Sequence, residues 1–424
     1  MPGQRAVAPP HRAHPSPPLP LQTRMLVLQP TPFCNLDCDY CYLPQRDLRA
    51  RMSIDTLQRA VERLLDEGLL GPTLTVVWHA GEPLVLPPAY FERAFEVVAR
   101  VLGSHCRPQH AIQTNATLLD DAWCDLLRRH GVRVGVSVDG PDWLHDAHRR
   151  TRDGRGSHGL VLRGLARLRA HGLACHAIAV VTRATLDDPD GFFDFFAQQG
   201  IREVGCNFDE AEGVHLRSSL AGHEAAHAAF LGRLLERSIA SGGRVVFREL
   251  AGALQRIAGP WPEADGGPRP DGDRGACTPA NEQTLPLAIV TVAWNGDFGT
   301  FSPELLGQRA PAFGDFVLGN VARDGYLEAL AGERAQRLWH EVAAGVEACR
   351  ARCAYFDLCG GGAPANKWYE NGSLASTETL YCRSMVQRPV EVVLRRLEQD
   401  RAALGSGEAP RDAARPVHLE GASA

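Results

Sequence analysis

The sequence predicts an α/β fold in which helices lie outside a parallel sheet. Between residues 25 and 241, six strand-like segments alternate with helix-like segments, and parallel strands require crossover connections of that kind. The chain has 424 residues, of which 44% are hydrophobic and 22% charged. This composition is typical of a globular protein, and the length allows one large barrel or two to three domains. The alternation itself is equally consistent with a partial barrel of six units and a doubly wound sheet.

Each expected strand is a short apolar run followed by a helical pattern. The first helix has the clearest start, because Ser53 is a good N-cap and Asp55 follows in the first turn. The expected strands are 25–29, 74–78, 110–114, 132–138, 174–181 and 203–207. The expected helices are 54–65, 89–102, 120–129, 160–170 and 188–199.

The rest of the chain lacks this alternation of strand-like and helix-like segments. Residues 1–23 contain seven prolines and are expected to be a disordered leader. The core barrel or sheet is expected over 24–241, a linker over 242–276 that includes a Pro/Gly/Asp loop, and a smaller domain over 277–390. That domain contains a predicted hairpin at 288–300 with Asn295-Gly296 as its turn. Residues 391–424 are expected to be the end of a helix and a disordered tail.

Charge and hydropathy exclude several classes of protein. The 45 basic and 50 acidic residues give a formal net charge of −5, so a strongly basic nucleic-acid binder is not indicated. The sequence has no uninterrupted apolar stretch near the ~20 residues that a membrane span needs. The N-terminus lacks the pattern of a signal peptide, so we expect a cytoplasmic protein. Because thiols stay reduced there, the twelve cysteines indicate metal or cluster binding rather than disulfides.

The most specific motif is a group of three cysteines directly after the first expected strand. Cys34, Cys38 and Cys41 fall within eight residues, in a loop at the carboxyl end of a strand, where barrel enzymes build active sites. Three thiolates can hold three irons of a four-iron, four-sulfur cluster and leave the fourth iron open. A zinc site is the alternative, although it requires a fourth ligand that the nearby sequence does not supply.

A second cysteine group lies near the C-terminus, on a glycine-rich stretch that begins Gly360-Gly-Gly. Its four thiols can close around one metal centre, and the glycines would let backbone amides turn toward sulfur. A structural zinc site with four cysteines remains the alternative. The members of this group are Cys349, Cys353, Cys359 and Cys382.

The first cysteine group resembles the signature of the radical S-adenosylmethionine (SAM) enzymes. This resemblance implies a partial (β/α)6 TIM barrel and a four-iron cluster whose open iron binds SAM. It also implies that one-electron reduction cleaves SAM to a 5′-deoxyadenosyl radical, with the electron delivered by a donor of the flavodoxin or ferredoxin type. Tyr40 matches the aromatic residue that lies near the adenine.

Other polar segments match SAM-binding positions of that family at the ends of the second, third and fourth strands. Their alternative roles are helix caps and loop turns. His79 and His145 are expected to make local hydrogen bonds rather than to bind metal. The residues implied to contact SAM are Ala80, Gly81, Glu82, Pro83, Gln113, Asn115, Ser137 and Arg149.

The second cysteine group resembles the SPASM domains, which carry auxiliary four-iron clusters in enzymes that modify peptides and proteins. The full SPASM pattern has two auxiliary clusters, whereas here Phe301 and Ala363 stand where two thiols are required. Only Cys277 remains of that set, with Cys206 as a possible neighbour. Two four-iron clusters are therefore expected in all. Three further cysteines are expected to be small core residues: Cys106, Cys124 and Cys175.

Several short sequence segments between residues 24 and 388 resemble those of the GrrM-type, cyclophane-forming maturases of ribosomally made peptides. The implied reaction removes a side-chain hydrogen from a precursor peptide and forms a crosslink or a related oxidation product. Glu304 is the candidate base. The 23 residues before Arg24 are too few for a winged-helix leader-binding domain, so the leader would bind the junction of the two domains or a separate protein. The alternatives are a sulfatase-maturing, formylglycine-generating enzyme and a non-catalytic zinc-binding partner protein.

Overall fold

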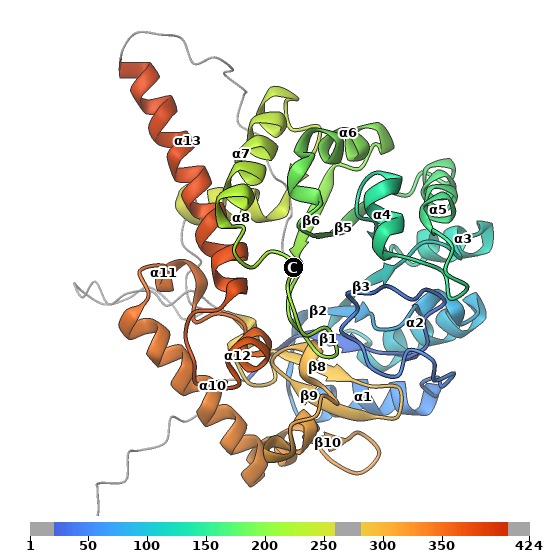
Figure 1. Cartoon of the computed structure of the whole chain (residues 1–424). Coiled ribbons are helices and arrows are strands. Elements are labelled where there is room, and N and C mark those ends of the chain that lie inside the picture. The colour runs from blue at the N-terminus through green and yellow to red at the C-terminus, as the bar shows by residue number, and fades with distance from the viewer. Residues whose placement is uncertain (1–20, 259–280, 406–424) are drawn as a thin grey trace, which may run out of the picture.

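The order of the strands decides between the two predicted architectures. In the computed structural model, which describes residues 21–258 and 281–405, the strands form one sheet in the order β10-β9-β8-β1-β2-β3-β4-β5-β6-β7. From β1 to β6 each strand pairs in parallel with the next along the chain. A doubly wound sheet reverses its strand order at a switch point. The uninterrupted order is that of a barrel, which confirms the predicted partial barrel (Figure 1).

The predicted segments agree with barrel elements to within a few residues, and the described part of the barrel also contains one strand and three helices that were not predicted. Its strands are β1 (Thr23–Leu28), β2 (Leu70–Trp78), β3 (Arg107–Thr114), β4 (Arg133–Ser137), β5 (Cys175–Val181), β6 (Glu203–Phe208) and β7 (Val246–Phe247). Its helices are α1 (Ile54–Asp66), α2 (Pro88–Leu102), α3 (Asp121–Arg129), α4 (Asp142–His148), α5 (His158–Ala170), α6 (Pro189–Gln199), α7 (Glu224–Ala240) and α8 (Arg248–Ala258). Ser53 caps α1 as predicted, because its side chain accepts a hydrogen bond from the Thr56 amide at 2.9 Å.

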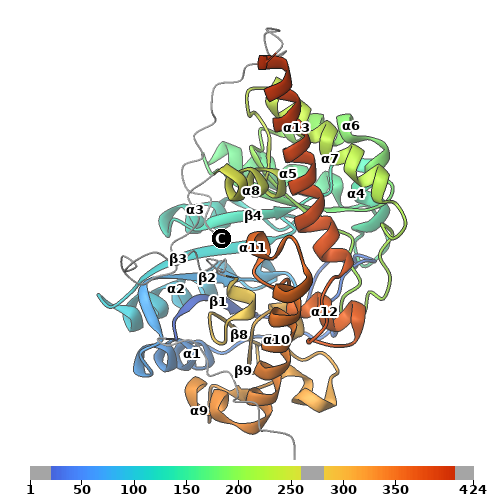
Figure 2. The same cartoon turned by 90° about the vertical axis from the view of Figure 1, so that its left-hand side faces the viewer.

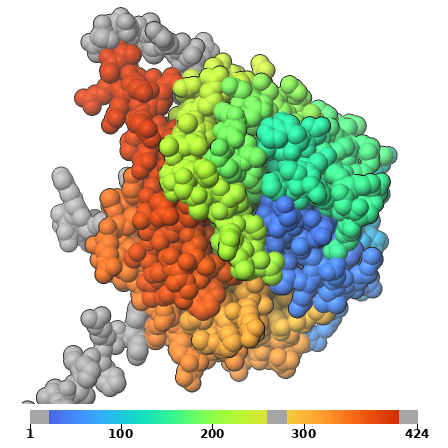
Figure 3. Space-filling view, in the orientation of Figure 1, coloured from blue at the N-terminus to red at the C-terminus, as the bar shows by residue number. Residues whose placement is uncertain are grey.

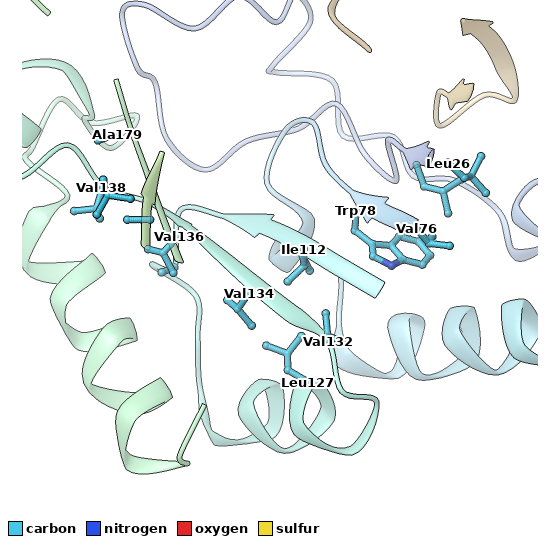
Figure 4. Close-up of a cluster of buried hydrophobic side chains, with 14 of the residues drawn as sticks. Leu26, Val76, Trp78, Ile112, Leu127, Val132, Val134, Val136, Val138 and Ala179 are labelled. Atoms are coloured by element: carbon cyan, nitrogen blue, oxygen red, sulfur yellow. The ribbon is translucent and has the colours of Figure 1, made fainter. Parts of the chain in front are cut away.

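The barrel core lies between the sheet and its outer helices. Alternate residues of each strand point to this side, and Figure 4 shows Trp78, Ile112, Val134 and Val136 packed there, with Leu127 from the helix layer. The intervening positions face the lumen. This alternation directs Gln113 and Ser137 away from the apolar layer and toward the interior of the barrel.

The C-terminal region is joined to the barrel sheet rather than forming a separate sheet. Strands β8 (Ile289–Val292) and β9 (Asp297–Thr300) form the predicted hairpin, and β8 pairs in parallel with β1. The short β10 (Gly319–Asn320) pairs with β9. The helices of this region are α9 (Tyr326–Ala331), α10 (Glu333–Arg352), α11 (Phe356–Cys359), α12 (Pro364–Asn371) and α13 (Arg388–Gly405). Figure 2 shows them on one side of the barrel, where α13 contacts α7 and α8.

Some predictions concern residues outside the described part of the chain. These are the leader up to residue 20, the loop 260–275, Cys277 and the tail beyond residue 405. The predicted linker 242–276 does contain β7 and α8 where it is described, and β7 pairs with β6. No helix within residues 21–258 or 281–405 combines the length and the apolar composition of a membrane span.

The fold gives a prediction about two helical glycines. A Cβ at Gly164 in α5 would lie 2.2 Å from the Ala116 carbonyl oxygen, whereas a Cβ at Gly232 in α7 would meet no atom within 4 Å. Gly232→Ala should therefore raise the free energy of unfolding by about 0.5–1 kcal/mol. Gly164→Ala should lower it by about 1–3 kcal/mol, because α5 must move away from the loop after β3. Denaturant unfolding of both variants measures the two effects, and stabilisation of both would contradict the close approach.

Candidate active site

The segment that carries the first three cysteines is held against the loop after β2. A Cβ on Gly81 would lie 2.5 Å from the Phe33 carbonyl oxygen and 2.6 Å from that of Thr31. The Glu82 amide donates to the same Phe33 oxygen at 2.9 Å. Both Ala80 and Gly81 have positive φ, at 72° and 57°. Only a residue without a side chain allows two backbones to approach in this way.

Two of the three thiols face a cavity. Cys38 and Cys41, together with Tyr40, line a cavity of about 390 Å³ inside the barrel. The third thiol, Cys34, accepts hydrogen bonds from the Leu36 amide at 3.4 Å and from Asn115 Nδ2 at 3.9 Å. Burial raises the pKa of Cys34 to about 12 and that of Cys38 to about 11. Buried thiolates need positive charge beside them, and iron would supply it.

Glu82 connects the ends of two strands. Its buried carboxylate accepts hydrogen bonds from Thr114 Oγ1 at 2.7 Å, the Asn115 amide at 2.7 Å and the Leu84 amide at 3.0 Å. Burial raises its pKa to about 7. All these hydrogen bonds are made within the protein, and they fix the loop after β2 relative to the end of β3. This loop includes Pro83, which begins a short 3₁₀ turn.

The predicted SAM-binding residues of β3 and β4 meet in the lumen. Gln113 Nε2 donates to Ser137 Oγ at 2.9 Å, and Gly135 leaves room for this, since a Cβ there would lie 2.1 Å from Gln113 Oε1. Asn115 donates from Nδ2 to Asn35 Oδ1 at 2.9 Å. The structure therefore brings Gln113 and Ser137 together and joins Asn115 to the cysteine segment.

The sequence analysis did not single out Asp139, which organises another group. Arg149 binds it with two hydrogen bonds, from Nε at 2.9 Å and from Nη2 at 3.1 Å, and the Tyr40 hydroxyl donates to the same carboxylate. Burial would raise the pKa of Asp139, but the Arg149 charge, the hydrogen bonds from Arg149 and Tyr40 and the nearby His145 together outweigh burial and lower that pKa. Asp139 lies two residues after Ser137, at the end of β4. This position could have identified it as a candidate site residue.

Acidic side chains form another part of the cavity wall. Glu304 lies in a 3₁₀ turn (Pro303–Leu305) after β9 and lines the same cavity as Cys38 and Cys41. Glu210 and Glu212, which the sequence analysis missed, line it as well. They follow β6 at the carboxyl edge of the barrel, where barrel enzymes build active sites. This position in the sequence could have identified them as candidate site residues. In Figure 3 the yellow-green segment after β6 crosses this face between the blue and orange parts of the chain.

The two histidines of the motif segments have different surroundings. His145 Nε2 lies 2.9 Å from Ser157 Oγ, and its Nδ1 accepts from the Asp139 amide at 3.4 Å. This is the local hydrogen bonding that was predicted for His145. His79 lines the cavity, where burial lowers its pKa to about 4 and keeps it neutral.

The second cysteine group surrounds another cavity. Its four thiols, from Cys349, Cys353, Cys359 and Cys382, line a space of about 350 Å³. The Gly362 amide donates to Cys359 Sγ at 3.2 Å, and Thr379 Oγ1 donates to Cys382 Sγ at 3.2 Å. Gly360, Gly361 and Gly362 all have positive φ. Backbone amides are therefore turned toward sulfur as the glycine run predicted.

Packed side chains occupy the two positions where the full SPASM pattern has further thiols. Phe301 is 1% exposed and stacks on Trp339, with ring centroids 6.3 Å apart and an interplanar angle of 11°. Ala363 is buried and lines the first cavity. Cys206 is buried in β6, and its amide donates to Glu249 Oε2 at 2.9 Å. Cys106 and Cys124 are buried, and Cys175 is partly buried.

Comparison with known proteins identifies relatives of the chain. Residues 28–196 match the Radical SAM superfamily. An uncharacterized protein of Synechocystis is 39% identical over 383 residues, which cover 89% of this chain and 92% of that protein. A serine-type anaerobic sulfatase-maturating enzyme of Bacteroides thetaiotaomicron is 31% identical over 214 residues. That match covers 46% of this chain and only 50% of the enzyme, so the likeness to the sulfatase-maturating relatives spans about half of their length.

Two solved structures share the fold over most of the chain. The structure of native anSMEcpe with bound AdoMet aligns with a TM-score of 0.68 and 22% identity, covering 88% of this chain and 98% of that one. Streptococcus suis SuiB bound to its precursor peptide SuiA aligns with a TM-score of 0.54 and 15% identity, covering 85% and 76%. These two likenesses show the fold, whereas the family match over residues 28–196, taken with the cysteine motif after β1, shows that the chain is a radical SAM enzyme.

Proposed function

We propose that this enzyme is a peptide maturase that removes a side-chain hydrogen from a ribosomally made precursor and forms a cyclophane-type crosslink or a related oxidation product. The observation that carries the proposal is the cavity in which Cys38 and Cys41 lie together with Glu304. Such a cavity would hold the site of radical formation and a proton acceptor around one substrate side chain. The comparison proteins anSMEcpe and SuiB have each been solved with a peptide bound, which supports a peptide as the substrate.

The groups that the reaction needs fit particular residues of this chain. The first cysteine group would hold a four-iron cluster, and the second would hold an auxiliary cluster with four ligands. Bound cluster and SAM supply, after one-electron reduction, a 5′-deoxyadenosyl radical that takes a hydrogen atom. Tyr40, the backbone of residues 80–83, Gln113, Asn115, Ser137 and Arg149 would orient SAM beside the cavity.

Residues of this chain would accept the proton from the substrate and limit the access of water. Burial raises the pKa of Glu304, which favours its protonated form once this carboxyl group has taken a proton from the substrate. The segment after β6 contributes Glu210 and Glu212 to the cavity wall, and its Val214 amide donates to the Tyr42 carbonyl oxygen at 3.3 Å. A wall of this kind limits the access of solvent to a reactive intermediate.

Sulfatase maturation is the second candidate function, favoured by the 31% identity to the Bacteroides enzyme. Phe301 and Ala363 weigh against it, because they stand where the full pattern has thiols. Incubating the reconstituted enzyme with SAM, dithionite and candidate peptides separates the two. Peptide maturation would remove two hydrogen atoms per crosslink, whereas formylglycine would give an aldehyde that reacts with a hydrazide. A colourless protein that contains zinc would instead indicate the non-catalytic alternative.

The first prediction from this proposal concerns the cysteine triad. Replacing Cys34, Cys38 and Cys41 together by alanine should abolish reductive cleavage of SAM, because no open iron remains. The second cluster should still assemble. Chromatographic measurement of 5′-deoxyadenosine checks the result, and its continued formation by the triple variant would overturn the assignment.

A further prediction concerns SAM binding. Ser137→Ala and Gln113→Ala should each weaken SAM binding by a few-fold to about tenfold while both clusters remain, because a neutral hydrogen bond contributes roughly 0.5–1.5 kcal/mol. Equilibrium dialysis with labelled SAM measures the loss. Since the two side chains bond to each other at 2.9 Å, the double variant should lose less than the product of the two single effects. Unchanged affinity in both single variants would assign these residues to packing alone.

The number of clusters gives a third prediction. Anaerobically reconstituted protein should contain about eight irons per chain, because two complete sets of cysteines each hold a four-iron cluster. Cys277→Ala should leave this number unchanged, while replacement of Cys349 and Cys382 should halve it. Colorimetric iron and sulfide analysis measures both. An iron content near that of three clusters in the native protein would show that other ligands complete a further site.

A further inference from the structure

Three carboxyl groups from distant parts of the chain meet in the wall of the active-site cavity. Glu210 and Glu212 come from the segment after β6, and Glu304 comes from the turn after β9. Glu210 lies beside Glu212 and raises its pKa. Asn366 on α12 donates from Nδ2 to Glu210 Oε2 at 2.6 Å. The group is thus held from both halves of the molecule.

These carboxyl groups lack a positive partner. In the described part of the chain no basic side chain forms an ion pair with Glu210, Glu212 or Glu304. The two arginines of the cavity wall are already engaged, Arg149 with Asp139 and Arg248 with Glu249. Burying carboxylates without a counter-ion is costly, so burial favours the protonated forms of these groups unless a cation enters.

Two hydroxyl groups at the same cavity lack hydrogen-bond partners. Ser302 is 3% exposed, and neither its Oγ nor the buried Tyr42 hydroxyl has a partner among the described residues. Both residues line the cavity. Buried polar atoms without partners are rare in folded proteins. A ligand that carries several N–H donors would satisfy both hydroxyls and the carboxylates.

We infer that this acidic wall, defined by Glu210, Glu212, Glu304, Ser302 and Tyr42, binds a cationic side chain of the peptide next to the residue that is modified. The inference rests on the proposed peptide-modifying function and specifies its substrate. A guanidinium group fits best, because its five donors form a planar fork that matches paired carboxylates. The bound cation would place the neighbouring residue of the peptide beside the cysteine side of the cavity.

The electrostatics of the empty wall agree with this inference. Burial, followed by the nearby carboxylates of Glu304, Glu370 and Asp209, raises the pKa of Glu210 to about 8. The pKa of Glu212 is raised well above its usual value by burial and by Glu210. Burial therefore favours the protonated forms of both groups in the empty cavity. A guanidinium would favour their charged forms and donate a charge-assisted hydrogen bond to each.

A pair of short peptides tests the inference on the reconstituted enzyme with SAM present and no reductant. The first is a blocked pentapeptide with arginine at its centre and glycine elsewhere. The second carries citrulline, the neutral analogue of arginine, at the same place. Calorimetric titration should show at least tenfold tighter binding of the arginine peptide. The double variant Glu210→Gln with Glu212→Gln should remove this preference, and Glu304→Gln should reduce it.

Glu236→Gln is the matched control, because Glu236 is an exposed carboxylate on α7 that pairs with Arg233 at 3.1 Å. It should keep the full preference. Equal binding of the two peptides by the native enzyme, no binding of either, or a preference retained by the double variant would each overturn the inference. Formation of 5′-deoxyadenosine with dithionite, measured without peptide, tests the proposed radical chemistry separately. Thermal unfolding shows whether each glutamine variant is folded, and Glu304→Gln provides an independent test if the double variant is not.

Discussion

The active site depends on how the carboxyl ends of the first three strands are fixed to one another. Glu82 accepts hydrogen bonds from both Thr114 and the Asn115 amide, and the adjoining Gly81 lies directly against the backbone of residues 31–33. The loops after β1, β2 and β3 therefore form one rigid unit around Cys34, Cys38 and Cys41. Three flexible loops would otherwise lose much conformational entropy each time that cofactors bound.

Much of the fold could be predicted from the sequence, because its main signals are local. Ser53 acts as a helix cap without help from distant residues, and the apolar runs identified all six main strands. Strand starts were less well predicted. β2 begins at Leu70 and β3 at Arg107, in each case before a proline that reads as a strand breaker. Proline is tolerated near the first residues of a strand, and pairing with the neighbouring strand extends both strands backward.

Only part of the candidate site could be predicted from the sequence, because some of its residues come together through distant contacts. The cysteine motifs depend on spacing, which the sequence displays directly. The surroundings of Glu210 depend on Asn366, which lies 156 positions further along the chain, and no local pattern reports such a contact. A loop carboxylate is usually hydrated. Only the packing of the C-terminal region against the barrel makes Glu210, Glu212 and Glu304 exceptions.

The pairing of β8 with β1 makes the two halves of the molecule depend on each other. Without the C-terminal region, β1 would be the exposed edge of a parallel sheet, with Leu26 and Leu28 beside unpaired backbone groups. Such an edge recruits other chains and promotes aggregation. A barrel expressed alone would therefore be poorly soluble. Two fragments separated between α8 and β8 should instead reassemble when co-expressed, since the sheet itself provides the interface that joins them.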